Sequence, residues 1–170
     1  ILILFWWSTE LSAQDSTWVE EDSRQYKIAD ANATFSGAAA HMVDYLNGGR
    51  ANGPITLSYV ELYHTTALWH NKAGMQETAL SYVDTTLALR MSTPGGSLTE
   101  LARTEHLKGE ILYMLGIFRP ASRWFDQGLT TLRRAMAAGD SLGKNLDRIQ
   151  YFSARSALMA TFLHDFDKAE

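Results

Sequence analysis

The sequence predicts an all-α protein, built from antiparallel helix-turn-helix pairs that stack as an α-solenoid. Three observations lead to this fold class. Helix signals run along most of the chain, with almost no strand alternation. Glycine and proline interrupt the chain at intervals that leave segments of helical length. One pattern of small and aromatic residues recurs, as expected of stacked repeats.

Residues 1–14 are apolar from Ile1 to Trp7 and end in small residues at Ser12 and Ala13. This pattern indicates the remnant of a secretory signal peptide, although the basic segment of a complete signal is missing. So short an apolar run cannot span a bilayer, and a truncated membrane anchor or a buried N-terminal element are the alternatives. We therefore expect an exported protein of the periplasm or cell envelope, with the cytoplasm as the alternative.

Residues 15–53 are expected to form an N-terminal helical segment or a degenerate repeat. Gly48-Gly49 and Gly53-Pro54 then break the chain. Helix pairs are predicted at about 54–96 and 97–140, with a truncated pair at 141–170, and we expect more chain to follow.

Local signals set the limits of these pairs. Pro94-Gly95-Gly96 ends the first pair, and an interruption from Gly139 to Gly143 ends the second. Ser97 and Glu100 form a capping box, in which the serine oxygen accepts from a first-turn amide and the glutamate reaches back. A helix should therefore begin just after Ser97.

A small residue and an alanine twelve positions later recur in all three pairs, with a turn residue between them. Two antiparallel helices approach closely only where side chains are small, and large side chains such as Phe125 can fill the space beside them. A generic helix bundle is the alternative, but a bundle has no reason to keep this offset. The aligned pairs are Ala67 and Ala79, Gly109 and Ala121, and Ala157 and Ala169, with the turns at Gly74, Gly116 and His164.

This pattern resembles the tetratricopeptide repeat (TPR), over about residues 57–170. The period here is longer than the usual length of about 34 residues, and it is similar to the long-period variant of bacterial signalling and scaffold proteins. The best copy of the motif consists of Gly109, Leu112, Gly116, Phe118, Ala121, Phe125 and Gly128.

The resemblance implies a non-enzymatic scaffold that binds a protein or peptide partner in the concave groove of the stacked pairs, lined by the first helix of each pair. The members that grip a C-terminal carboxylate have paired lysine and asparagine where His64 and Leu68 stand here, so no carboxylate clamp is expected. The implied groove residues are Glu61, His64, Leu68, Asn71 and Lys72 in the first unit, Arg103, His106, Glu110, Tyr113 and Met114 in the second, and Tyr151, Leu158, Thr161 and Phe162 in the third.

His64 and His106 take the same register position in successive units, so both rings are expected to face the groove. Two ordinary surface histidines are the simpler interpretation. As a functional pair they would make binding depend on pH across about 6–7. The pair His106 and Glu110 is expected to be a hydrogen-bonded pair on the helix surface rather than a catalytic or metal-binding one.

Composition and motifs exclude several classes of function. A formal net charge of -4 lacks the basic stripe that binding to nucleic acid requires. The chain has no cysteine, and it has neither the HExxH metal motif nor a nucleophile or phosphate-binding motif. We expect no enzyme activity, no cofactor, no metal and no membrane contact by the folded part. The alternative function is the sensory region of a longer membrane-anchored bacterial signalling protein, with a histidine kinase or DNA-binding domain beyond residue 170.

Overall fold

The computed structural model describes residues 35–49, 57–140 and 142–169, and all of its regular structure is helical, with no strand among these residues. This confirms the all-α class. The predicted signal remnant and residues 15–34 lie outside the described residues. The helices are α2 (Phe35–Gly49), α3 (Leu57–Lys72), α4 (Gln76–Ser92), α5 (Leu98–Met114), α6 (Phe118–Ala137) and α7 (Leu142–Ala169).

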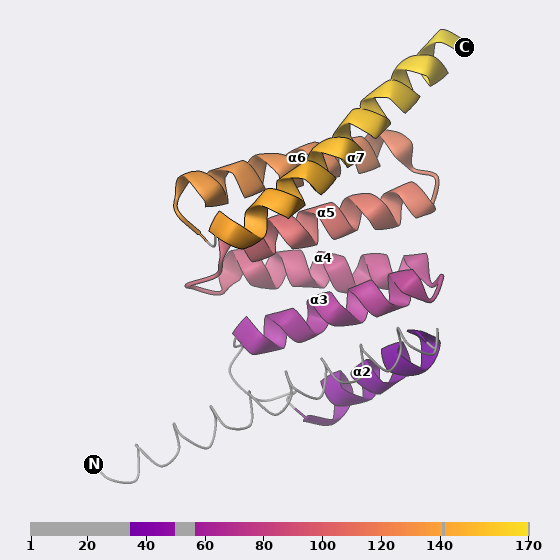
Figure 1. Cartoon of the computed structure of the whole chain (residues 1–170). Coiled ribbons are helices and arrows are strands. Elements are labelled where there is room, and N and C mark those ends of the chain that lie inside the picture. Colours follow the sequence, from indigo (N-terminus) through magenta and orange to yellow (C-terminus); the bar gives the residue numbers. More distant parts are fainter. Residues whose placement is uncertain (1–34, 50–56, 141, 170) are drawn as a thin grey trace.

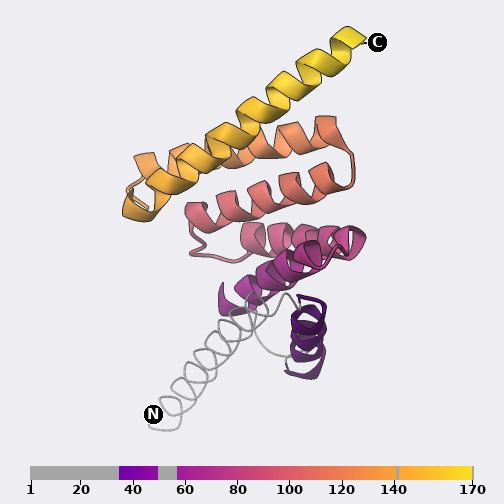
Figure 2. The same cartoon turned by 45° about the vertical axis from the view of Figure 1, so that its right-hand side comes forward.

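Each helix packs against the next along the chain, and α3 also contacts α5. The helices follow one another in chain order across the molecule, from α2 at one end to α7 at the other (Figure 1). In the turned view, the end of α7 diverges from α6 and projects beyond it (Figure 2). The described part of the segment 15–53 is α2, which buries Met42 and Leu46 in one core cluster with Trp69 of α3.

Three of the helices end in the same hydrogen-bonded turn. At the end of α3, the amide of Gly74 donates to the carbonyl of Asn71 and the amide of Met75 donates to that of His70. The same pair of bonds closes α5 at Gly116 and α6 at Gly139. All three glycines have a positive φ, which side chains disfavour, so glycine at these places ends the helix.

The predicted helix start after Ser97 is confirmed, since α5 begins at Leu98. The Ser97 side chain accepts hydrogen bonds from the amides of Thr99 and Glu100. Asp140, from the end of α6, also accepts from the Thr99 amide at 3.2 Å. The cap therefore joins the start of α5 to the end of α6.

The small residues of the first two pairs lie at helix contacts. Ala67, Ala79 and Ala121 are fully buried. Gly109 faces the ring of Phe125 so closely that a Cβ at position 109 would come within 2.7 Å of it. The aligned small residues of these two units are therefore explained by close packing.

The third unit differs from the prediction, because α7 continues through His164 without a turn and Ala157 is exposed. The helix also includes Gly143, which the sequence assigned to an interruption. The other two units turn at a glycine of positive φ. His164 is a poor residue for that conformation, so nothing at this place ends the helix.

Candidate functional site

Two of the predicted groove residues, Glu61 and Arg103, meet in a polar network between α3, α4 and α5. Arg90 donates from Nη2 to Glu61 Oε2 at 2.5 Å, and Arg103 donates from Nη1 to Glu61 Oε1 at 3.3 Å. Glu100 pairs with Arg103 and lies 3.9 Å from Arg90. The two carboxylates and two guanidinium groups balance each other, so this part of the predicted groove has no spare charge for a ligand.

His64 lies inside this network and is only 3% exposed. Its Nδ1 is 3.1 Å from Thr104 Oγ1, which also accepts a hydrogen bond from Arg90. Burial lowers the pKa of His64 well below its usual value, and the charges of Arg103 and Arg90 act in the same direction. His64 is therefore neither the surface histidine of the simpler interpretation nor a groove residue that titrates across about pH 6–7, because side chains from three helices enclose the ring.

His106 is also 3% exposed, but its neighbours are aromatic. Its ring stacks on Phe152 of α7, with centroids 3.9 Å apart and planes 14° apart. Burial lowers the pKa of His106 to about 3, and the charge of Arg155 adds to the effect. Glu110 Oε1 lies 3.8 Å from His106 Nδ1. His106 is therefore a neutral core residue, and neither an exposed pair with Glu110 nor a pH-dependent groove residue.

Beside His106, three polar side chains join α5 to α7. The hydroxyl of Tyr151 donates to Glu110 Oε1 at 2.6 Å. Arg155 donates to the same hydroxyl from Nη2 at 3.3 Å. Sequence reasoning missed Arg155, although it lies four residues after Tyr151 and therefore one turn along the same helix face.

Predicted groove residues of the first two units gather around one pocket of about 190 Å³. Its lining residues come from α3, α5, α6 and α7. Oδ1 of Asn71 is buried and accepts no hydrogen bond from any residue in the described ranges. The lining residues are Asn71, Glu110, Tyr113, Met114, Phe125 and Arg155.

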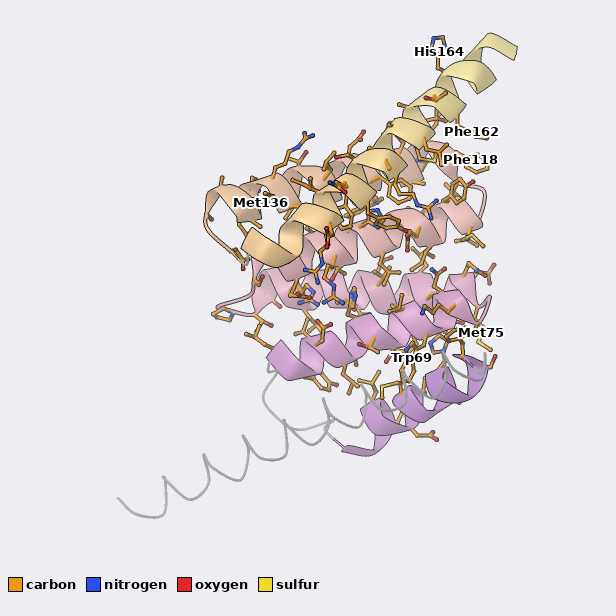
Figure 3. The ribbon with its side chains drawn as sticks, in the orientation of Figure 1. Trp69, Met75, Phe118, Met136, Phe162 and His164 are labelled. Carbon is orange, nitrogen blue, oxygen red and sulfur yellow. The ribbon has the colours of Figure 1, made fainter. Side chains whose placement is uncertain are left out.

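The predicted residues of the third unit lie on the exposed surface of α7. Tyr151, Leu158 and Phe162 are large apolar side chains that remain exposed. Their spacing places them on one face of the helix. Phe162 contacts Phe118 of α6, with ring centroids 4.8 Å apart, and Figure 3 shows the two together where α7 leaves α6.

The remaining predicted residues have no common environment. Leu68 packs between the core clusters of α2–α3 and α3–α5. Lys72 lies over the ring of Phe35, 5.0 Å from its centroid. Thr161 bonds to the carbonyl of Ala157 within its own helix. The structure thus brings Asn71, Glu110, Tyr113 and Met114 to one pocket, and it leaves the other predicted residues outside.

Two kinds of site are absent from the described part of the chain. Among residues 35–49, 57–140 and 142–169, no three His, Asp or Glu side chains are grouped so that they could hold a metal ion. None of the helices in these ranges combines the length and apolar character needed to cross a membrane.

No protein-family model, curated protein or solved structure matches the chain. The likeness to the TPR family therefore rests on the residues of this sequence alone.

Proposed function

We propose that this chain is a non-enzymatic scaffold, whose TPR-like helix pairs stack as an α-solenoid and bind a peptide segment of a partner protein. The peptide would lie along the face shared by α3, α5 and α7. The observation that carries the proposal is the pocket of about 190 Å³. Four of its lining residues are ones that the alignment of the repeats assigned to a groove. They come from two successive units.

The chemistry of the pocket suits a peptide. Tyr113 and Met114 offer apolar surface to a side chain, and the buried ring of Phe125 also lines the pocket. A volume of this size exceeds that of several water molecules, each of which takes about 30 Å³ in the liquid. The buried Oδ1 of Asn71 is a hydrogen-bond acceptor without a donor among the described residues, and a backbone N–H of the peptide would supply one.

The exposed apolar face of α7 supports a longer contact. Tyr151 and Leu158 flank Arg155, which lines the pocket, and scattered single apolar residues would not form such a row. An extended or helical peptide with two or three apolar residues would cover both the pocket and this face. The charges of Glu110 and Arg155 are already paired through Tyr151, so the apolar contacts would supply most of the affinity.

A phage-displayed library of random peptides, selected on the purified chain, tests the proposal. A selected peptide is then synthesised and titrated calorimetrically. Met114 is 61% exposed, so Met114→Glu should leave the fold intact while placing a charge in the pocket. We expect at least a tenfold loss of affinity in this variant.

Met75→Glu is the matched control, since Met75 is an exposed methionine that does not line this pocket. The control should bind the selected peptide as the parent does. Equal loss in both variants, equal binding by both, or a selection that yields no specific peptide would each contradict the proposed function.

A further inference from the structure

A second and larger pocket, of about 460 Å³, lies among α4, α5 and α6 and shares no lining residue with the first. Leu87 and Met91 of α4 and Leu101 of α5 give it apolar walls. Met91 is 81% exposed, so this side of the pocket is open to solvent. The repeat register assigns none of these residues to a peptide groove.

The carboxylate of Glu105 lies in the wall of this pocket, although the residue is only 3% exposed. Gln127 donates from Nε2 to Glu105 Oε1 at 2.8 Å. The second oxygen, Oε2, is buried and accepts no hydrogen bond from the residues that the structure describes. A buried carboxylate oxygen without a donor is unusual in a folded protein, because desolvating it is unfavourable.

An aromatic ring and a second carboxylate add to the attraction for a cation. Trp124 lines the pocket, and its ring already holds one cation, since Lys108 Nζ lies 4.2 Å from the ring centroid. Lys108 is fixed there by Asp84, with Nζ 2.7 Å from Oδ1. Asp126 supplies another negative charge to the lining. Two positive charges act against a cation here: Arg134 in the lining, and Lys108 beside Trp124, whose charge Asp84 offsets.

We propose that this pocket binds a guanidinium group on an apolar stem, as in an arginine side chain. The guanidinium would donate to Glu105 and lie against Trp124, while the stem packs on Leu87 and Met91. A guanidinium fits better than an ammonium because it is planar, weakly hydrated and stacks on aromatic rings. The group could belong to a peptide or to a free alkylguanidine.

Titrations followed by NMR test this site on the whole chain. The probes are the blocked peptide acetyl-Ala-Arg-Ala-amide, the same peptide with neutral citrulline in place of arginine, and butylguanidinium chloride. The reporter is the indole N–H signal of Trp124, assigned by its loss in Trp124→Phe. We expect a saturable shift with the arginine peptide, and binding at least tenfold weaker with the citrulline peptide.

The two guanidinium probes separate the sources of the ligand. Tighter binding of the arginine peptide than of butylguanidinium indicates a peptide ligand. Equal or tighter binding of butylguanidinium indicates a free small molecule. No saturable shift with either probe, or equal binding of the arginine and citrulline peptides, would overturn the proposal.

Three variants complete the test. Glu105→Gln keeps the shape and removes the charge, so the arginine peptide should bind at least tenfold more weakly. Thr130 is an exposed lining residue, and Thr130→Lys should block the pocket without changing Glu105, which keeps the test decisive if Glu105→Gln does not fold. Glu77→Gln, an exposed glutamate outside the pocket, should bind as the parent does. Unchanged binding in both pocket variants would contradict the assignment, whatever Met114→Glu does at the other pocket.

Discussion

The pairs α3–α4 and α5–α6 share a register, yet they fill the contact between their helices differently. In the first pair, Ala67 and Val83 lie in one core cluster. In the second, glycine at position 109 leaves room for the ring of Phe125, which stands forty-two residues after Val83. A smaller residue on one helix goes with a larger one on the other. The two units therefore fill the equivalent contact with different pairs of residues, alanine with valine in the first and glycine with phenylalanine in the second.

The histidines of the two units also share a register position but differ in their surroundings. His64 is enclosed by polar side chains, including Thr104 and two arginines, whereas His106 lies among aromatic rings. Both are buried, and both have a lowered pKa. One position thus serves as a core residue in two chemically different environments.

Truncating Phe125, the larger residue at the contact of the second pair, should give the largest loss of stability. Phe125→Ala should lower the free energy of unfolding by about 3–5 kcal/mol, because it removes a buried ring and leaves a cavity beside Gly109. Val83→Ala should cost less, because it removes only two methyl groups from the equivalent place. Urea unfolding of both variants measures the difference. Equal losses of unfolding free energy would mean that the ring of Phe125 contributes no more to the helix contact than the side chain of Val83 does.

Exchanging the residues between the units tests the comparison directly. Gly109→Ala should cost about 1–3 kcal/mol, since the new Cβ would meet the Phe125 ring at 2.7 Å. Adding Phe125→Val recreates the alanine–valine pair of the first unit, so the double variant should lose less than the sum of the two single losses.

Gly37→Ala is the control for this cycle, because a Cβ at Gly37 meets no atom of the described residues within 4 Å. It should be neutral or stabilising by up to about 1 kcal/mol, since alanine favours a helix over glycine. Additive losses in the double-mutant cycle would rule out size compensation at this contact.

Burial of the histidines predicts a dependence of stability on pH. The unfolded chain binds a proton at each histidine near pH 6.5, whereas folded His106 binds one only near pH 3. Stability should therefore fall as pH decreases between these values, by about 2 kcal/mol from pH 7 to pH 5 for one such histidine. The free energy of unfolding in urea, measured at both pH values, gives this change.

His106→Gln removes one of the buried histidines, so this variant should lose less stability between pH 7 and pH 5 than the parent does. His164→Gln should leave the loss unchanged, because His164 is exposed. The same loss in all three proteins would mean that His106 titrates normally in the folded state.

Local rules predicted much of the fold. The turn glycines, the cap at Ser97 and the small residues at the helix contacts each depend on a few neighbouring positions. The same rules failed at His164, where an alanine match five residues on suggested a turn, but no glycine stands there and the helix continues. A match of small residues alone is therefore weak evidence for a helix end.

The site was less predictable, because its contacts join distant parts of the chain. Arg90 reaches Glu61 across twenty-nine residues, and the sequence register gave no sign of it. Asn71 and Met114, which the alignment assigned to a groove, both line the smaller pocket, since each lies near the end of a first helix. The burial of His106 depends on how α7 crosses α5, which periodicity does not specify.

The smallest difference in stability between equivalent variants is expected at the turns that follow α3 and α5, where the two units are most alike. Gly74 and Gly116 have φ of 79° and 77°, the same two hydrogen bonds, and open space where a Cβ would stand. Alanine at either place meets only the backbone penalty of a positive φ, about 1 kcal/mol. Gly74→Ala and Gly116→Ala should therefore lower the free energy of unfolding equally, as measured in urea. If one of them costs at least 1 kcal/mol more than the other, the turns are not equivalent, and the likeness of the two units is limited to their helix contacts.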